Sequence, residues 1–308
     1  MSEFYLRPAE QDDYDDVAAF TQETWPERDG GDYIPRVYHD WIETDDARTL
    51  VADAGDDVAG ICQCVLLSEH EAWGQGIRVN PDYRGIGVAT DLTEAVFDWA
   101  RDQGATVCRN MVFSWNDAGL GQARAVGFDP ATEFRWATPE PDADAAPDSA
   151  AGATHDPGLR VTGDPEAAWS CFRRSDAARR LGGLALDLEE SWAVAELTRD
   201  RLRRAADSER VFAIKGTGER AGTRAASCRV RSASYGDETS YAEYGVAAWD
   251  DLAAARSLFA AIARDAATLD VDETRVLIPE TVRHVSDVAR VRAGFSDEPD
   301  FVLEADLT

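Results

Sequence analysis

The stretch Val79-Asn-Pro-Asp-Tyr-Arg-Gly-Ile-Gly-Val-Ala89 joins a predicted strand, residues 73–79, to a predicted amphipathic helix, residues 87–103. Its glycines allow the backbone to approach a ligand without interference from a Cβ atom. A helix that starts here presents unpaired N–H groups and the positive end of its dipole, and the arginine of the stretch adds a cation. The sequence therefore predicts an anion site suited to a pyrophosphate.

Two other interpretations of this stretch are open at this point. The glycines could serve only the geometry of a strand–turn–helix junction. A dinucleotide site of the Rossmann type would expect a third Gly or Ala where Thr90 stands, and would usually follow the first strand of a parallel sheet. Here several strand-like segments come before the turn.

Two motifs resemble those of the GNAT superfamily of N-acetyltransferases. The coenzyme A motif of that family, Arg/Gln-x-x-Gly-x-Gly/Ala, often follows Val-x-Pro, and here Val79-Asn-Pro81 precedes Arg84-Gly-Ile-Gly87-Val-Ala89. A second family motif is an Asn followed after about ten residues by Gly-Phe, which Asn116 and Gly127-Phe128 match. The resemblance covers residues 1–138.

This resemblance implies acetyl-coenzyme A as a cosubstrate, with no metal. A β-bulge near Ile77 and Val79 would bind pantetheine through backbone groups, and Asn116 would contact the pantetheine arm near the thioester. The backbone N–H groups that would hold the pyrophosphate belong to Arg84, Gly85, Ile86, Gly87, Val88, Ala89 and Thr90.

The family transfers acetyl directly from the thioester to an amine, and the N–H of Val79 would polarise the carbonyl. Many members carry a Tyr as general acid four residues before the Gly of the Gly-Phe pair, where this sequence has Ala123. The candidates for a general base are Glu69, His70 and Glu71, and the candidates for an acceptor pocket are Trp25, Tyr33 and Trp73. The expected function is N-acyl transfer to a small-molecule or peptide amine, and the alternative is an acyl-CoA-binding regulatory or scaffold protein that has lost turnover.

The chain is long enough for two domains. A Pro/Ala/Asp/Gly-rich segment, residues 139–157, reads as a linker between domains at 1–138 and 158–308. Both halves show a similar order of predicted strands and helices, with a long helix expected at 189–206. The fold class we expect is α/β (α+β), with two GNAT-like domains, each a mixed, mostly antiparallel sheet flanked by helices.

The second half lacks the glycine turn. Trp249 stands where a phosphate would need access, and Asp250 and Asp251 would repel a pyrophosphate while suiting a helix N-terminus. We therefore expect one cofactor site per chain. The second domain would pack against the first, shape the acceptor site or form a homodimer.

The composition is strongly acidic, with 59 Asp and Glu against 31 Lys and Arg and a net charge of −28. Such a surface repels nucleic acids and anionic membranes. Because the acidic residues are spread over both halves, we hypothesise a halophilic protein in a salt-rich cytoplasm. The N-terminus has no signal-peptide pattern and no apolar run could span a membrane, so a cytoplasmic location is expected. Cys62 and Cys64 share a strand face, where small buried side chains are favoured over a metal pair.

Overall fold

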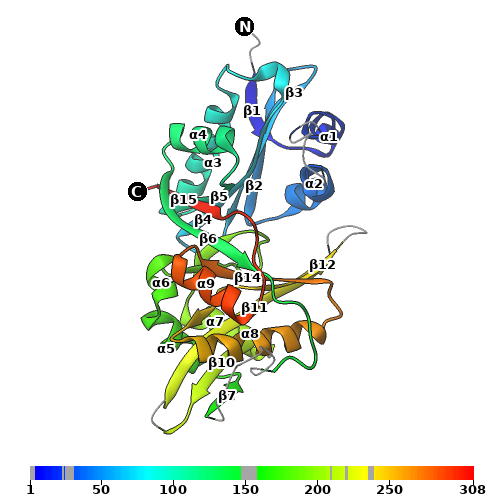
Figure 1. Cartoon of the computed structure of the whole chain (residues 1–308). Helices are drawn as coiled ribbons and strands as arrows, with labels where there is room; N and C mark the ends of the chain where they lie inside the picture. The colour runs from blue at the N-terminus through cyan, green and yellow to red at the C-terminus, as the bar shows by residue number, and fades with distance from the viewer. Residues whose placement is uncertain are drawn as a thin grey trace. The chain divides into compact units, whose positions relative to one another are not determined.

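The computed structural model describes residues 4–22, 24, 31–146, 158–208, 210–218, 221–234 and 239–308 (Figure 1). Trp25 and residues 147–157 of the predicted linker therefore lie outside the described residues. The chain divides into two compact units. The first is Met1–Pro130 together with Leu303–Thr308, and the second is Ala131–Val302.

The first unit is a sheet with helices on both faces. Its elements are β1 (Tyr5–Pro8), α1 (Tyr14–Thr21), α2 (Ile34–Glu43), β2 (Ala47–Asp53), β3 (Val58–Leu66), β4 (Glu71–Val79), α3 (Val88–Asp102), β5 (Val107–Phe113), α4 (Asp117–Ala125) and the end of β15 (Asp300–Asp306). The strand order is β1-β2-β3-β4-β5-β15, in which β4 and β5 are parallel while β1 to β4 are antiparallel.

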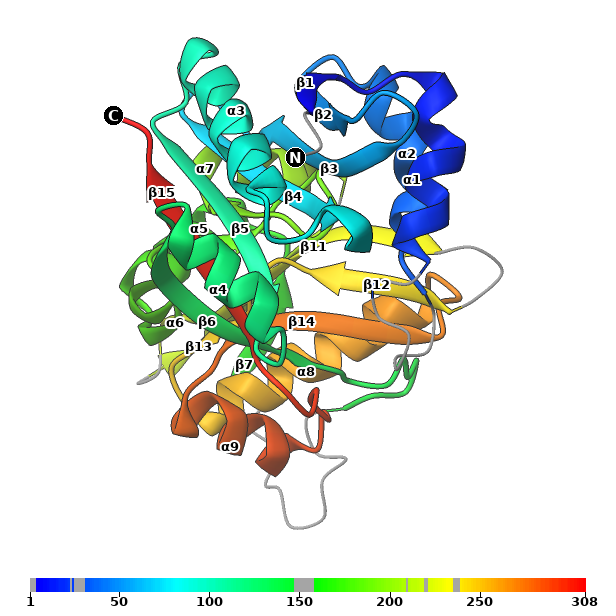
Figure 2. The same ribbon diagram turned by 90° about the horizontal axis from the view of Figure 1, so that it is seen from above.

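The two faces of this sheet carry different helices (Figures 1 and 2). On one face, α1 and α2 bury Val17, Tyr38 and Trp41 against strand residues such as Ile61. On the other face, α3 lies so close to β3 that a methyl group at Gly60 would be 2.9 Å from Val88 Cγ1. The start of α3 is thus seated directly on the sheet.

The second unit has a similar order of elements. They are β6 (Asp129–Ala137), β7 (Leu159–Thr162), α5 (Pro165–Arg174), α6 (Asp176–Arg180), β8 (Leu184–Leu186), β9 (Val194–Glu196), α7 (Arg199–Asp207), β10 (Val211–Gly216), β11 (Gly222–Ser234), β12 (Ser240–Tyr244), β13 (Ala248–Trp249), α8 (Leu252–Ala267), β14 (Glu273–Pro279), α9 (Val282–Val291) and the start of β15. Its main sheet has the order β6-β14-β12-β11-β10-β7, in which β12 and β14 are parallel. The predicted fold class, mixed and mostly antiparallel sheets flanked by helices, is confirmed.

The last strand of each unit comes from a distant part of the chain. In the first unit the N–H of Leu307 donates to the Thr106 carbonyl at 2.9 Å. In the second, β6 pairs antiparallel with β14, with Trp136 opposite Leu277. The compact units therefore divide at Pro130 and again at Leu303, whereas the sequence analysis placed the division at the linker.

The helix predicted over residues 189–206 is correct only for residues 199–206 and wrong for residues 189–198. The segment instead forms the short strand β9, which pairs antiparallel with β8, and helix α7 follows it. Two local features explain the difference. Trp192 has a positive φ of 63°, which interrupts a helix, and the Thr198 side chain accepts the N–H of Arg201 and so starts α7 there.

Candidate coenzyme A site in the first unit

The predicted phosphate-binding turn is anchored by Asn80, whose side chain is buried. Its Oδ1 accepts the N–H of Asp82 at 3.1 Å, and its Nδ2 donates to the Val58 carbonyl and to Asp57 Oδ2, each at 3.2 Å. These bonds tie the end of β4 to the start of β3 and aim the following residues towards α3. This anchoring role of Asn80 was not predicted from the sequence.

The turn itself needs glycine at two positions. Gly85 has a φ of 79° and Gly87 a φ of 100°, both in the left-handed region that other residues enter at a cost. Gly87 is the N-cap of α3, and no side chain caps the first N–H groups of the helix. The first backbone bond of the helix joins the N–H of Asp91 to the Gly87 carbonyl at 3.0 Å. The N–H groups that precede it have the helix geometry that suits an anion.

The predicted cofactor residues differ in their exposure. Arg84, Gly85, Ile86 and Gly87 are exposed, Ile86 to 50%, which is high for a large apolar side chain. Val88 is buried in the core, and Ala89 and Thr90 are half-buried. Val88 could therefore contribute only its backbone to a ligand.

Strands β4 and β5 separate as they run towards the turn. Their parallel register covers only three pairs and ends at Trp73 and Arg109, although β4 continues to Val79 and β5 to Phe113. In the same part of β4 the register with β3 shifts, since Gln63 faces Gln75 while Ile61 faces Arg78. This β-bulge contains Gly76, with a φ of 66°, and Ile77. Backbone groups on both inner strand edges thus lie past the end of the ladder.

In the second unit the corresponding parallel strands, β12 and β14, stay hydrogen-bonded at the equivalent point. There the N–H of Ala247, which follows β12, donates to the Leu277 carbonyl of β14 at 2.9 Å. Asp251 caps α8 with its side chain, by accepting the N–H of Ala254. Trp249 is 2% exposed, and its Nε1 donates to Asp287 Oδ2 at 2.8 Å. A bulky ring and a carboxylate thus take the place of the glycine turn.

His284 packs edge-on against Trp249, with ring centroids 5.0 Å apart, and hydrogen-bonds Thr281 Oγ1 through Nδ1. Burial lowers the pKa of His284 to about 4. The folded state therefore favours the neutral ring, so its stabilising effect is present above the ordinary pKa near 6.5 and is lost as the pH falls towards 4.

From this pKa we expect the free energy of unfolding to fall by about 2 kcal/mol between pH 7 and pH 5 through His284 alone. Urea unfolding at both pH values would measure the change. The His284→Gln variant, which cannot be protonated, should show a pH dependence that is smaller by this amount. Equal pH dependence in both proteins would contradict the assignment.

The three candidates for a general base lie where β4 begins. Glu69 and His70 are exposed in the turn before the strand, and His70 Nδ1 lies 3.4 Å from Ser68 Oγ. Glu71 is 2% exposed and forms an ion pair with Arg109, whose Nη1 lies 2.7 Å from Glu71 Oε1. All three precede the part of β4 that separates from β5, and Glu71 is engaged in a buried ion pair.

The structure gives Asn116 and Ala123 structural roles. Asn116 is the N-cap of α4, where its Oδ1 accepts the N–H of Gly119 at 2.9 Å. Ala123 is 1% exposed in the same helix, and its methyl side chain carries no hydroxyl. The adjacent Gln122 instead donates to Thr93 Oγ1 at 3.1 Å and so links α4 to α3.

The α2 face of β4 holds a salt bridge that the sequence analysis missed. The Asp32 carboxylate is fully buried and accepts from Arg78 Nε at 2.6 Å, and the Arg78 guanidinium lies 5.6 Å from the centre of the Tyr33 ring. Tyr33 in turn packs edge-on against Trp41. Trp73 is 2% exposed, which makes it a core residue of the first unit. No local pattern could have paired Asp32 with Arg78, because 46 residues separate them.

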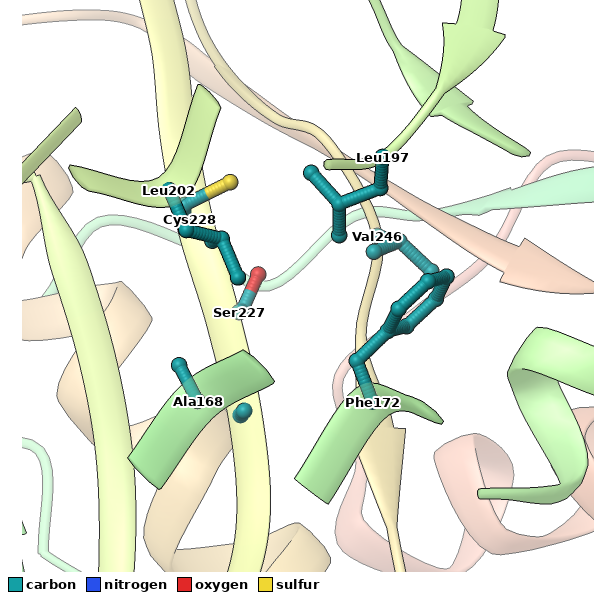
Figure 3. Close-up of a pocket in the computed structure, with 8 residues that line it drawn as sticks. Ala168, Phe172, Leu197, Leu202, Ser227, Cys228 and Val246 are labelled. Atoms are coloured by element: carbon teal, nitrogen blue, oxygen red, sulfur yellow. The ribbon is translucent and has the colours of Figure 1, made fainter. Parts of the chain in front are cut away.

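A small cavity of about 10 Å³ lies in the second unit, with Phe172, Leu202 and Val246 among its lining residues (Figure 3). Such a volume holds about one water molecule. Its lining is apolar apart from Ser227 and Cys228, and burial raises the pKa of the Cys228 thiol to about 12. This cavity is therefore a packing defect and not a site for a coenzyme.

Over the described ranges, no group of three or more His, Cys, Asp or Glu is arranged to hold a metal ion. Within the same residues, no helix combines the length and the apolar character that crossing a bilayer requires.

Comparison with known proteins agrees with this geometry. Residues 14–128 match the acetyltransferase (GNAT) family. The whole fold is similar to a GCN5-related N-acetyltransferase from Sphaerobacter thermophilus, with 15% identity, a TM-score of 0.62, and 99% of this chain and 96% of that chain covered. It is also similar to a tandem GNAT protein from the clavulanic acid biosynthesis pathway, with 13% identity, a TM-score of 0.57 and 99% of each chain covered. A search of curated proteins found no significant match.

The family match falls on the unit that contains the glycine turn, the bulge and the separating strands. The two structural similarities each cover 99% of this chain, so they include the fold of the second unit. The acetyltransferase (GNAT) family thus matches residues 14–128, and the fold of the whole chain is similar to that of a tandem GNAT protein.

Proposed function

We propose that this chain is an acetyl-CoA-dependent N-acyltransferase with one cofactor site, in the first unit. The observation that carries the proposal is the combination of the turn at Gly85 and Gly87 with the separation of β4 and β5 beside it. The turn offers backbone N–H groups to a pyrophosphate, and the separated strands offer backbone edges to a pantetheine arm. The described residues of the second unit show neither feature.

Each part of the site has a separate task in this proposal. The N–H groups of residues 84–90 hold the pyrophosphate, and the exposed guanidinium of Arg84 adds charge complementarity. The bulge near Ile77–Val79 aligns the thioester, and the N–H of Val79 polarises its carbonyl. An amine acceptor attacks directly, so no covalent enzyme intermediate is needed.

The two proton transfers of the reaction have no assigned acid or base in this proposal. An amine must lose a proton before it attacks, and the thiolate that leaves must gain one. Because Ala123 replaces the usual tyrosine, the thiolate would take its proton from water or from a group that reaches the site with the acceptor. The acceptor class we propose is a small-molecule or peptide amine.

The same residue supports a second candidate function. A chain that binds acyl-CoA but lacks a general acid at position 123 could act as a regulatory or scaffold module. Release of free thiol, measured with acetyl-CoA and a panel of amines, separates the two. Acceptor-dependent release supports the enzyme. Calorimetric binding of acetyl-CoA without release across the panel supports the binding module, and the absence of binding refutes both.

Two acidic residues flank the proposed pyrophosphate-binding turn, Asp82 before it and Asp91 after it. Asp91 lies in the first turn of α3, and its Oδ1 is 4.0 Å from the position that a Cβ atom would take at Gly87. Asp82 is exposed in the preceding turn. Their charges oppose an anionic ligand at low ionic strength, and salt screens this repulsion. The site is thus suited to the salt-rich cytoplasm that we propose for this acidic protein.

We therefore expect Asp91→Asn to raise the affinity for acetyl-CoA about fivefold at low salt, from the Coulomb energy of one charge near a pyrophosphate. The gain should disappear in molar KCl. Titration calorimetry of both proteins at low and high KCl would test this. An affinity ratio that does not change with salt would contradict the electrostatic explanation.

A further inference from the structure

Asn110 is a polar residue placed at the point where β4 and β5 separate. The last registered pair of the two strands is Trp73 and Arg109, and Asn110 is the next residue of β5. Its Oδ1 is buried and has no hydrogen-bond partner among the described residues. Leaving a buried amide oxygen unpaired destabilises the fold, so this one requires an explanation.

The side chain of Asn110 lies on the same face of the sheet as α3. Residues two apart in a strand share a face, so the side chain of Asn110 points to the same face as that of Cys108. A methyl group at Gly74 would be 3.5 Å from Cys108 Sγ and 3.9 Å from Phe128 Cζ. Phe128 packs edge-on against Phe97 of α3, with ring centroids 5.1 Å apart. The glycine turn at the start of α3 and the unpaired oxygen are therefore on one face.

The neighbouring residue on the strand points to the other face. Arg109 forms its ion pair with Glu71 there, on the side opposite Cys108. A ligand that reaches Asn110 Oδ1 therefore comes from the side of α3, where the proposed coenzyme lies.

The second unit supplies an internal comparison. Arg275 of β14 faces Glu243 of β12, as Arg109 faces Trp73, and the next residue of β14 is Val276. Val276 is fully buried and still in register, opposite Tyr244. Where the two strands stay paired, the position is apolar. Where they separate, it is an amide.

We propose that Asn110 Oδ1 accepts a hydrogen bond from an amide N–H of the pantetheine arm and so sets how far the thioester enters between β4 and β5. The assignment rests on the proposed function, because it requires coenzyme A in the first unit. Asn110 is then a binding and positioning residue for the acyl donor. Asn110 would therefore contribute to the binding of coenzyme A but not to the binding of its nucleotide part, which has the pyrophosphate and lacks the pantetheine amides.

The test compares two ligands on the full chain. Asn110→Leu should weaken acetyl-CoA binding about tenfold, the effect of one lost hydrogen bond. Its affinity for 3′-phosphoadenosine 5′-diphosphate, which lacks pantetheine, should stay within about twofold of the native value. Met111→Leu, on the opposite face of the same strand, is the matched control and should leave both affinities unchanged. Thermal unfolding of Asn110→Leu should show at least native stability, since an unpaired oxygen is removed.

Three results would overturn the assignment. These are an unchanged affinity of Asn110→Leu for acetyl-CoA, an equal loss for both ligands, and an equal loss in Met111→Leu. Failure of the proposed function has a different signature, because the native chain would then bind neither ligand, and the assignment would fall with it.

Discussion

Replacing Gly87 with tryptophan is expected to lower the affinity for acetyl-CoA by at least about a hundredfold, or more than about 2.7 kcal/mol. Gly87 is the N-cap of α3, so an indole attached there would fill the space in front of the first helical N–H groups. The ligand would lose several charge-assisted hydrogen bonds together. Titration calorimetry with acetyl-CoA measures the loss.

The fold should survive this substitution. A Cβ atom at Gly87 meets only Asp91 Oδ1, at 4.0 Å, so the cost is the strain of a positive φ of 100°, about 1–3 kcal/mol. Gly182 is a matched control, because it has a φ of 63° and nothing within 4 Å of an added Cβ. Gly182→Trp, in the second unit, should bind acetyl-CoA as the native chain does. Retained affinity in Gly87→Trp would mean that the site lies elsewhere.

Arg109→Leu is expected to destabilise the protein by about 3–5 kcal/mol, because it leaves the Glu71 carboxylate buried without its countercharge. The two groups are 7% and 2% exposed, and Arg109 Nε also lies 3.2 Å from Glu304. Urea unfolding would measure the loss. The exposed pair of Arg204 and Glu189 provides the control, since Arg204→Leu should change stability by less than about 1 kcal/mol.

A double variant separates charge from packing. Glu71→Gln in the Arg109→Leu background removes the uncompensated charge and should recover part of the lost stability. Glu71→Gln alone also tests the predicted role as a general base. If Glu71 is structural, the pH profile of acetyl transfer should keep its shape in that variant. A profile that loses its acidic limb would restore Glu71 as the base.

Much of the proposed cofactor site could be predicted because its determinants are local. Glycine at 85 and 87 is required by a backbone conformation, and the predicted start of the helix near 87 agrees with α3 beginning at Val88. The absence of such a turn before α8 could be predicted in the same way. Whether these residues hold coenzyme A stays a prediction, which the Gly87 variant tests.

The catalytic candidates were harder to judge from sequence. Glu71 resembled its exposed neighbours Glu69 and His70, and only the structure places it 2.7 Å from Arg109. The unpaired oxygen of Asn110 likewise could not be predicted, since the sequence around a single Asn in a strand does not indicate its hydrogen-bond partners. Both features arise between strands that are not adjacent in the chain.

The sequence alone determined the GNAT motifs of residues 14–128, the fold class, the glycine turn and its absence from the second half, because each of these depends on residue types at short, regular spacing. Tertiary structure alone decided the exchange of the last strands, in which Leu303–Thr308 belong to the first unit and β6 to the second. It also decided the separation of β4 from β5 after Arg109 and the closure of the corresponding strands at Ala247. A strand can hydrogen-bond to any free sheet edge, so its partner is selected by packing across the whole chain and not by its own residues.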